Sequence, residues 1–113
     1  MFIALYRWKL REGQEGRFQQ GWHRLTVEIY EKRGSLGSRL HRAEDGTWVA
    51  YAQWPDRQAW EAGRAQQVQD TEALQLMRES IEVSHPPTFM EIVDDLLAHE
   101  KKGAAPPTEP GHV

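Results

Sequence analysis

The sequence predicts a single mixed α+β domain with the element order β-α-β-β-α-β and an antiparallel sheet. Three observations predict it: a strand-like N-terminal stretch, a helix-like apolar stripe that stops at a glycine, and a central hairpin pattern that ends in a Trp-Pro corner. In this arrangement both helical segments lie on the same face of the sheet.

In residues 2–10 (FIALYRWKL), both the odd-numbered and the even-numbered positions, which face opposite sides of a strand, are apolar except at Arg7 and Lys9. We therefore expect both faces of this strand to be covered. Gly34 is the expected left-handed residue just beyond the end of the helix that follows. The apolar stripe of that helix has spacings of four, three and four, at Phe18, Trp22, Leu25 and Ile29.

Two strands then flank Asp45-Gly46, a dipeptide typical of two-residue hairpin loops. Such a loop pairs Arg39 with Ala52, Leu40 with Tyr51 and His41 with Ala50. One face of the hairpin would carry Leu40, Arg42, Val49, Tyr51 and Gln53, and the other Arg39, His41, Trp48, Ala50, Ala52 and Trp54.

After the Trp54-Pro55 corner, Asp56 is a candidate N-cap for a helix that Gly63 is expected to break or bend. A second helical piece should follow Asp70, and its apolar stripe is Leu74, Met77 and Ile81. The sequence His85-Pro86-Pro87 cannot continue a helix, so we expect the last strand at 89–93.

Composition excludes several classes of protein. There is no cysteine, so a disulfide framework and a thiolate site are excluded and a cytoplasmic location is expected. The net charge is −3 and the 14 Lys and Arg residues are dispersed, which argues against nucleic-acid binding. No stretch is apolar enough for a membrane span. We expect one domain over residues 1–97 and a tail over 98–113, disordered from about 103.

The predicted order is that of a ferredoxin-like sandwich, which leaves one face of the sheet without helices. Because the first strand is apolar on both faces and the hairpin adds Trp48, Tyr51 and Trp54, a bare face would expose an unusually large apolar patch. A homodimer formed through the uncovered sheet face resolves this.

Four segments resemble the antibiotic biosynthesis monooxygenase (ABM) family: 6–8 (YRW), 34–42 (GSLGSRLHR), 45–47 (DGT) and 52–61 (AQWPDRQAWE). The resemblance covers roughly residues 1–95. It implies a ferredoxin-like fold that pairs into a dimeric α+β barrel. It also implies either cofactor-independent oxygenation of small aromatics such as anthrones or quinols, or haem degradation.

The haem-degrading branch of the family is matched poorly. Its catalytic asparagine falls at Tyr6, and the helical stretch 67–80, where its axial histidine would lie, contains no histidine. Trp54 does match the branch's active-site tryptophan. The resemblance therefore favours a monooxygenase that uses no cofactor.

Such an enzyme needs an aromatic pocket, a group that accepts a proton, and donors or cations where an oxyanion develops. His41 is the expected base and Arg39 its neighbouring cation, both catalytic. The expected substrate-binding residues are Tyr6, Arg7, Trp22, Tyr51 and Trp54.

Plainer interpretations stay open for the same residues. His41 also fits a hydrogen-bonded sheet histidine, Arg7 and Arg39 fit ion pairs, and the tryptophans fit core packing. A non-catalytic homodimer that binds a hydrophobic metabolite is the alternative function. An RNA-binding module of the same element order lacks the basic cluster it would need. The histidines show no metal-ligand spacing, so no metal is expected.

Overall fold

The computed structural model describes residues 1–97; the predicted tail over 98–113 lies outside the described residues. The elements, in chain order, are β1 (Phe2–Leu10), α1 (Glu15–Lys32), β2 (Gly37–Arg42), β3 (Trp48–Trp54), α2 (Arg57–Ala65), α3 (Thr71–Ser80), β4 (Ile81–Ser84) and β5 (Thr88–Glu91). The predicted α+β class is confirmed.

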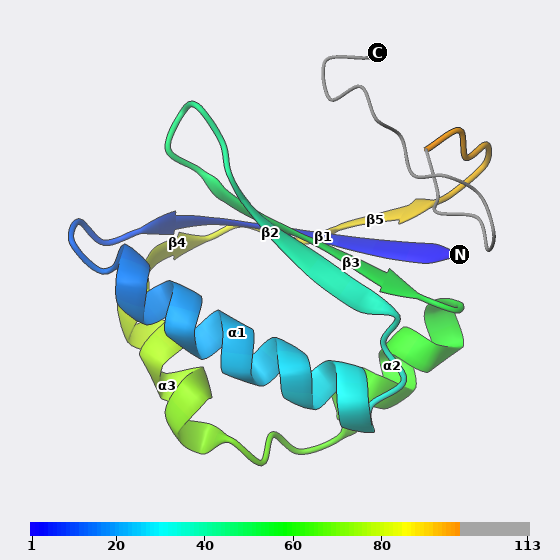
Figure 1. Cartoon of the computed structure of the whole chain (residues 1–113), viewed down its shortest axis with the longest axis horizontal. Coiled ribbons are helices and arrows are strands. Elements are labelled where there is room, and N and C mark those ends of the chain that lie inside the picture. The colour runs from blue at the N-terminus through cyan, green and yellow to red at the C-terminus, as the bar shows by residue number, and fades with distance from the viewer. Residues whose placement is uncertain (98–113) are drawn as a thin grey trace, which may run out of the picture.

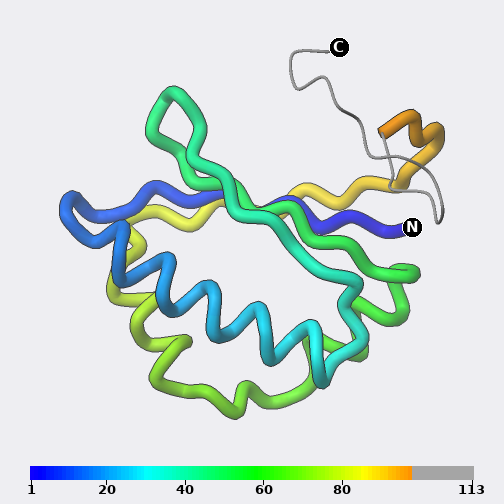
Figure 2. Tube along the Cα trace, in the orientation of Figure 1, coloured from blue at the N-terminus to red at the C-terminus, as the bar shows by residue number. Residues whose placement is uncertain are grey.

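The strands form one antiparallel sheet in the order β2-β3-β1-β4, and β5 also pairs with β1. All three helices of the described chain lie on one side of this sheet (Figure 1). The segment after β5, orange in Figure 2, lies on the other side. We call the two sides the helix face and the open face.

The hairpin between β2 and β3 corrects the predicted register by one residue. The Ala43 N–H donates to the Thr47 carbonyl at 2.8 Å, which is the last bond between the two strands, so residues 44–46 form a three-residue loop. The Gly46 N–H donates to the Ala43 carbonyl at 3.0 Å. Gly46 takes φ +88°, which suits the left-handed position of such a three-residue loop. The pairs are therefore Arg39 with Tyr51, Leu40 with Ala50 and His41 with Val49.

This shift moves the whole β2 set to the opposite face, as a one-residue slip must. Arg39 and His41 share the open face with Val49, Tyr51 and Gln53, whereas Ser38, Leu40 and Arg42 lie on the helix face with Trp48, Ala50, Ala52 and Trp54. The prediction that His41 lies on the same face of the hairpin as Trp48 and Trp54 was therefore wrong.

The end of the sheet differs from the prediction as well. α3 ends at Ser80, so Ile81 begins strand β4 instead of closing a helical stripe. β4 and β5 pair with successive parts of β1, and the two prolines that separate them have no N–H for the ladder. The His85 N–H still bonds the Arg7 carbonyl at 3.0 Å, so the two strands form one interrupted edge.

Helix ends follow the predicted signals. Asp56 and Asp70 accept the N–H groups of Ala59 and Ala73, which confirms Asp56 as the cap of α2. Gly34 has φ +83°, as expected beyond α1. Gly63 was predicted to break or bend its helix; α2 is not broken there and continues to Ala65.

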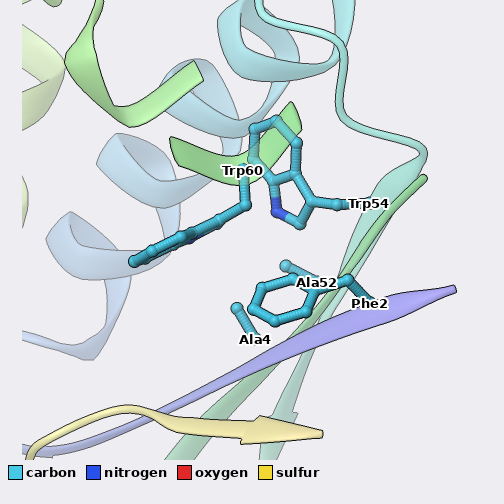
Figure 3. Close-up of a cluster of buried hydrophobic side chains, with 5 residues drawn as sticks. All are labelled: Phe2, Ala4, Ala52, Trp54 and Trp60. Atoms are coloured by element: carbon cyan, nitrogen blue, oxygen red, sulfur yellow. The ribbon is translucent and has the colours of Figure 1, made fainter. Parts of the chain in front are cut away.

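Two clusters form the core on the helix face. The first, shown in Figure 3, joins Phe2, Ala4, Ala52, Trp54 and Trp60; the second joins Trp8, Phe18, Trp48, Ala50 and Met77. Tyr6 packs against both clusters. The space between them is where the candidate site lies.

Candidate active site

A cavity of about 190 Å³ lies between α1 and the helix face of the sheet. The helix supplies its outer wall through Trp22, Leu25 and Ile29. Four aromatic side chains line it: Tyr6, Trp8, Trp22 and Trp54. This is an apolar pocket with a few polar groups, the composition typical of small-molecule sites.

The floor of the cavity is hollow because β3 alternates large and small residues on this face. Ala50 and Ala52 lie between Trp48 and Trp54, and each alanine leaves a gap that a larger side chain would fill. The two alanines are buried, at 2% and 8% exposure, so they form the bottom of the cavity. Residue size in one strand thus sets the position of the pocket.

Trp54, which lines this cavity, carries a buried hydrogen-bond donor. Its indole Nε1 is buried and has no hydrogen-bond partner, although the side chain is 5% exposed. A buried N–H without a partner costs about 1–3 kcal/mol, so the position calls for an acceptor.

The Trp54 ring is held from behind by α2. A Cβ on Gly63 would stand 2.6 Å from the far edge of the indole, so only a glycine lets the helix lie this close. Gly63 therefore belongs to the site because it fixes the orientation of the Trp54 ring. Figure 3 shows Trp54 at the end of β3 and Trp60 on the helix that follows it.

Tyr6 offers a second donor. The Trp60 Nε1–H donates to the Tyr6 hydroxyl oxygen at 3.0 Å. Because that bond uses an oxygen lone pair, the Tyr6 O–H proton stays available for the cavity. Two donors, from β1 and β3, thus border the same apolar space.

The other polar groups lining the cavity are hydroxyls, from Thr26, Ser35 and Ser38. Ser35 accepts the Gly37 N–H at 2.9 Å, which ties it to the start of β2. The cavity wall, as the structure describes it, carries no carboxylate and no imidazole. Within residues 1–97 no group of three or more His, Asp or Glu side chains is placed to hold a metal.

The structure divides the predicted site residues into two groups. Tyr6, Trp22 and Trp54 line the cavity. The other four lie on the open face, where Arg39, His41 and Tyr51 border a shallow groove with Leu5 and Val49, and Arg7 is exposed on the same side of β1.

His41 has defined surroundings on the open face. Its Nδ1 lies 3.1 Å from the Val49 carbonyl, which can only accept, so Nδ1 carries the proton. The side chain is exposed, and its Nε2 is left for another partner. The catalytic roles expected of His41 and Arg39 stay predictions, and the geometry separates them from the cavity by the thickness of the sheet.

Sequence reasoning missed several residues of the site: Ala50, Ala52, Gly63 and the Trp60 support of Tyr6. The alternation of alanine and tryptophan along 48–54 was the available signal for the cavity, because small residues between large ones on one face leave room. The close approach of Gly63 to Trp54 has no local signature, since it depends on how α2 packs.

The antibiotic biosynthesis monooxygenase family model matches residues 1–71. The chain belongs to this family. The match covers β1 through α2, which includes Tyr6, Trp22 and Trp54. The family resemblance stated from the sequence is confirmed.

Solved structures share the fold at low identity. SnoaB, a cofactor-independent oxygenase from Streptomyces nogalater, superposes with a TM-score of 0.70 at 18% identity, covering 84% of this chain and 95% of that one. Rv0793 from Mycobacterium tuberculosis gives 0.68 at 13% identity, covering 85% and 98%. A search of curated proteins finds no match. No helix within residues 1–97 is long and apolar enough to cross a membrane.

Proposed function

We propose that this protein oxidises an electron-rich aromatic of the anthrone or quinol class with dioxygen, without a cofactor, in the cavity between α1 and the sheet. The unpartnered Trp54 Nε1 carries the proposal, because it is a buried donor on a side chain that lines an apolar, aromatic-rich space. Membership of the ABM family supports it, and SnoaB of the same fold is a cofactor-independent oxygenase.

For an anthrone the chemistry is balanced without a cofactor. Loss of a proton from the ring methylene gives a delocalised anion whose charge rests mainly on oxygen. The carbon of this anion forms a bond to dioxygen, and the resulting hydroperoxide loses water to leave a carbonyl, so that CH₂ and O₂ become C=O and H₂O. Trp54 and Tyr6 would donate to the oxygen that holds the charge.

The proton has no acceptor among the side chains that line the cavity in the described chain. The substrate must therefore be acidic enough to enter as an anion or to lose its proton to water. The same observation favours a second candidate function, a homodimer that binds a hydrophobic metabolite without reaction.

Oxygen consumption by chelator-treated protein tests the proposal. We expect folded protein to accelerate uptake with an anthrone or hydroquinone panel, with one carbonyl formed per dioxygen, above the rate with boiled protein. Binding without uptake, measured by calorimetry on the same panel, would leave the binding protein as the function. His41→Ala belongs in the same assay, since loss of turnover without loss of affinity would move the reaction to the open face.

We also propose that the open face pairs with a second copy of the chain. Leu5, Val49 and Tyr51 are half-buried there with no helix above them (Figure 1), and Val93 and Leu96 beyond β5 are 92% and 90% exposed. We expect light scattering after size exclusion to give twice the chain mass. A Val49→Glu variant should give the monomer mass, and a wild-type monomer at micromolar concentration would contradict the proposal.

A further inference from the structure

A second depression adjoins the cavity at the sheet edge formed by β2. Its walls come from α1 and from the β2–β3 hairpin, and it has Trp22 and Ser38 in common with the cavity. The edge groove and the cavity therefore lie next to each other and share part of their walls. β2 is the last strand on this side, so the groove opens to solvent.

The edge groove carries only positive or neutral side chains. Its ionisable wall residues are His23 from α1 and Arg39, His41 and Arg42 from β2. No Asp or Glu of the described chain lines it, and within residues 1–97 neither arginine forms a salt bridge. Arginines without a carboxylate partner in a concave surface attract anions.

Arg42 is the arginine on the helix face, which is the side of the cavity. Its guanidinium lies 5.9 Å from the centre of the Trp48 ring. Stacking on an aromatic ring restricts a guanidinium while it leaves the N–H groups free to bind a carboxylate or an ionised hydroxyl. Arg39 and His41 belong to the open face and reach the groove over the strand edge.

We propose that the edge groove binds an anionic oxygen substituent of the aromatic whose ring occupies the cavity, so the preferred ligand is an aromatic carboxylate or phenolate. The inference rests on the proposed function and deepens it. Where the substituent is a phenolate, the groove also favours the ionised form of the ligand, so that proton needs no base in the cavity wall; a carboxylate anchors the ring and leaves the reacting proton to water.

The test is calorimetric binding of two probes that share one ring system, 1-hydroxy-2-naphthoate and neutral 1-naphthol. We expect the carboxylate probe to bind more tightly, and its advantage to shrink as salt is raised while the affinity for 1-naphthol stays constant. Arg42→Gln should weaken the carboxylate probe about fivefold and leave 1-naphthol unchanged. Arg17→Gln, an exposed arginine on the opposite side of α1, is the matched control and should change neither affinity.

Equal affinity for the two probes, or equal losses in Arg42→Gln and Arg17→Gln, would overturn the inference and leave the oxygenase proposal to the oxygen assay. Failure of both probes to bind would overturn it too. Preference for the anion in a protein that consumes no oxygen would support the groove and remove the oxygenase. The salt dependence is measured on wild-type protein alone, so this part of the test remains valid even if a variant fails to fold.

Discussion

Trp54→Phe is expected to lower the rate of oxygen consumption by about 10²–10³ while the protein stays folded. Phenylalanine keeps an aromatic ring at the end of β3 but removes the far edge of the indole that lies against Gly63 and the indole N–H, the one buried side-chain donor or acceptor in residues 1–97 that lacks a partner. A donor that meets a developing oxyanion in a dry cavity contributes far more than the same bond in water. The measurement is the initial rate of oxygen uptake with saturating anthrone.

Affinities separate the lost donor from a general packing defect. Wild-type protein should bind 1-naphthol more tightly than naphthalene, because the hydroxyl oxygen accepts from Trp54. In Trp54→Phe this difference should shrink while the affinity for naphthalene stays close to that of the wild type. Unchanged turnover, or discrimination of the hydroxyl that survives the substitution, would remove Trp54 from the mechanism and shift the role to the Tyr6 hydroxyl.

The fold could be predicted from sequence because its signals are local. The stripe of α1, the Asp56 cap and Gly34 each depend on residues within a few positions of one another. Strand β4 was missed because Ile81 continues the helical spacing of Leu74 and Met77 by chance. Its true partner, Leu10 of β1, lies some seventy residues away, where local pattern has no information.

The candidate site could be predicted only in part, and the reason is the hairpin. Asp45-Gly46 fits a two-residue loop, yet the chain uses a three-residue loop with Gly46 as its left-handed residue. Because of that one-residue difference, the predicted register placed Arg39 and His41 on the helix face, whereas they lie on the open face. The register error did not affect the prediction for Tyr6, Trp22 and Trp54, because the positions of β1, α1 and β3 do not depend on the loop.

Glu28→Gln is expected to destabilise the protein by about 3–5 kcal/mol at neutral pH, the cost of breaking a buried ion pair. Glu28 Oε2 accepts from Arg33 at 2.6 Å, and the two side chains are 8% and 7% exposed. The same carboxylate accepts the backbone N–H groups of Gln69 and Asp70, at 3.1 and 2.8 Å, so it ties α1 to the start of α3. Glutamine has one acceptor oxygen and leaves the Arg33 charge buried without compensation.

This contact also predicts a loss of stability in acid. Burial alone would raise the pKa of Glu28, but the N–H groups of Gln69 and Asp70 together with Arg33 outweigh it and hold the pKa below its ordinary value of 4.5. The Ala73 N–H and Arg24 lower the pKa of Asp70 in the same direction. Because a lowered pKa means that the folded state binds fewer protons, the stability from these groups is complete above their unfolded pKa values and is lost as the pH falls through the folded ones.

Urea unfolding followed by circular dichroism at fixed protein concentration, from pH 7 down to pH 3, measures both effects. The wild type should lose stability in the acid range more steeply than Glu28→Gln, since the variant has one fewer carboxylate to protonate. Glu31→Gln, an exposed residue of the same helix, should match the wild type within about 0.5 kcal/mol. If Glu28→Gln and Glu31→Gln lose the same small amount, the link between α1 and α3 would rest on apolar packing such as that of Gly21, where a Cβ would stand 2.6 Å from the Ala73 carbonyl.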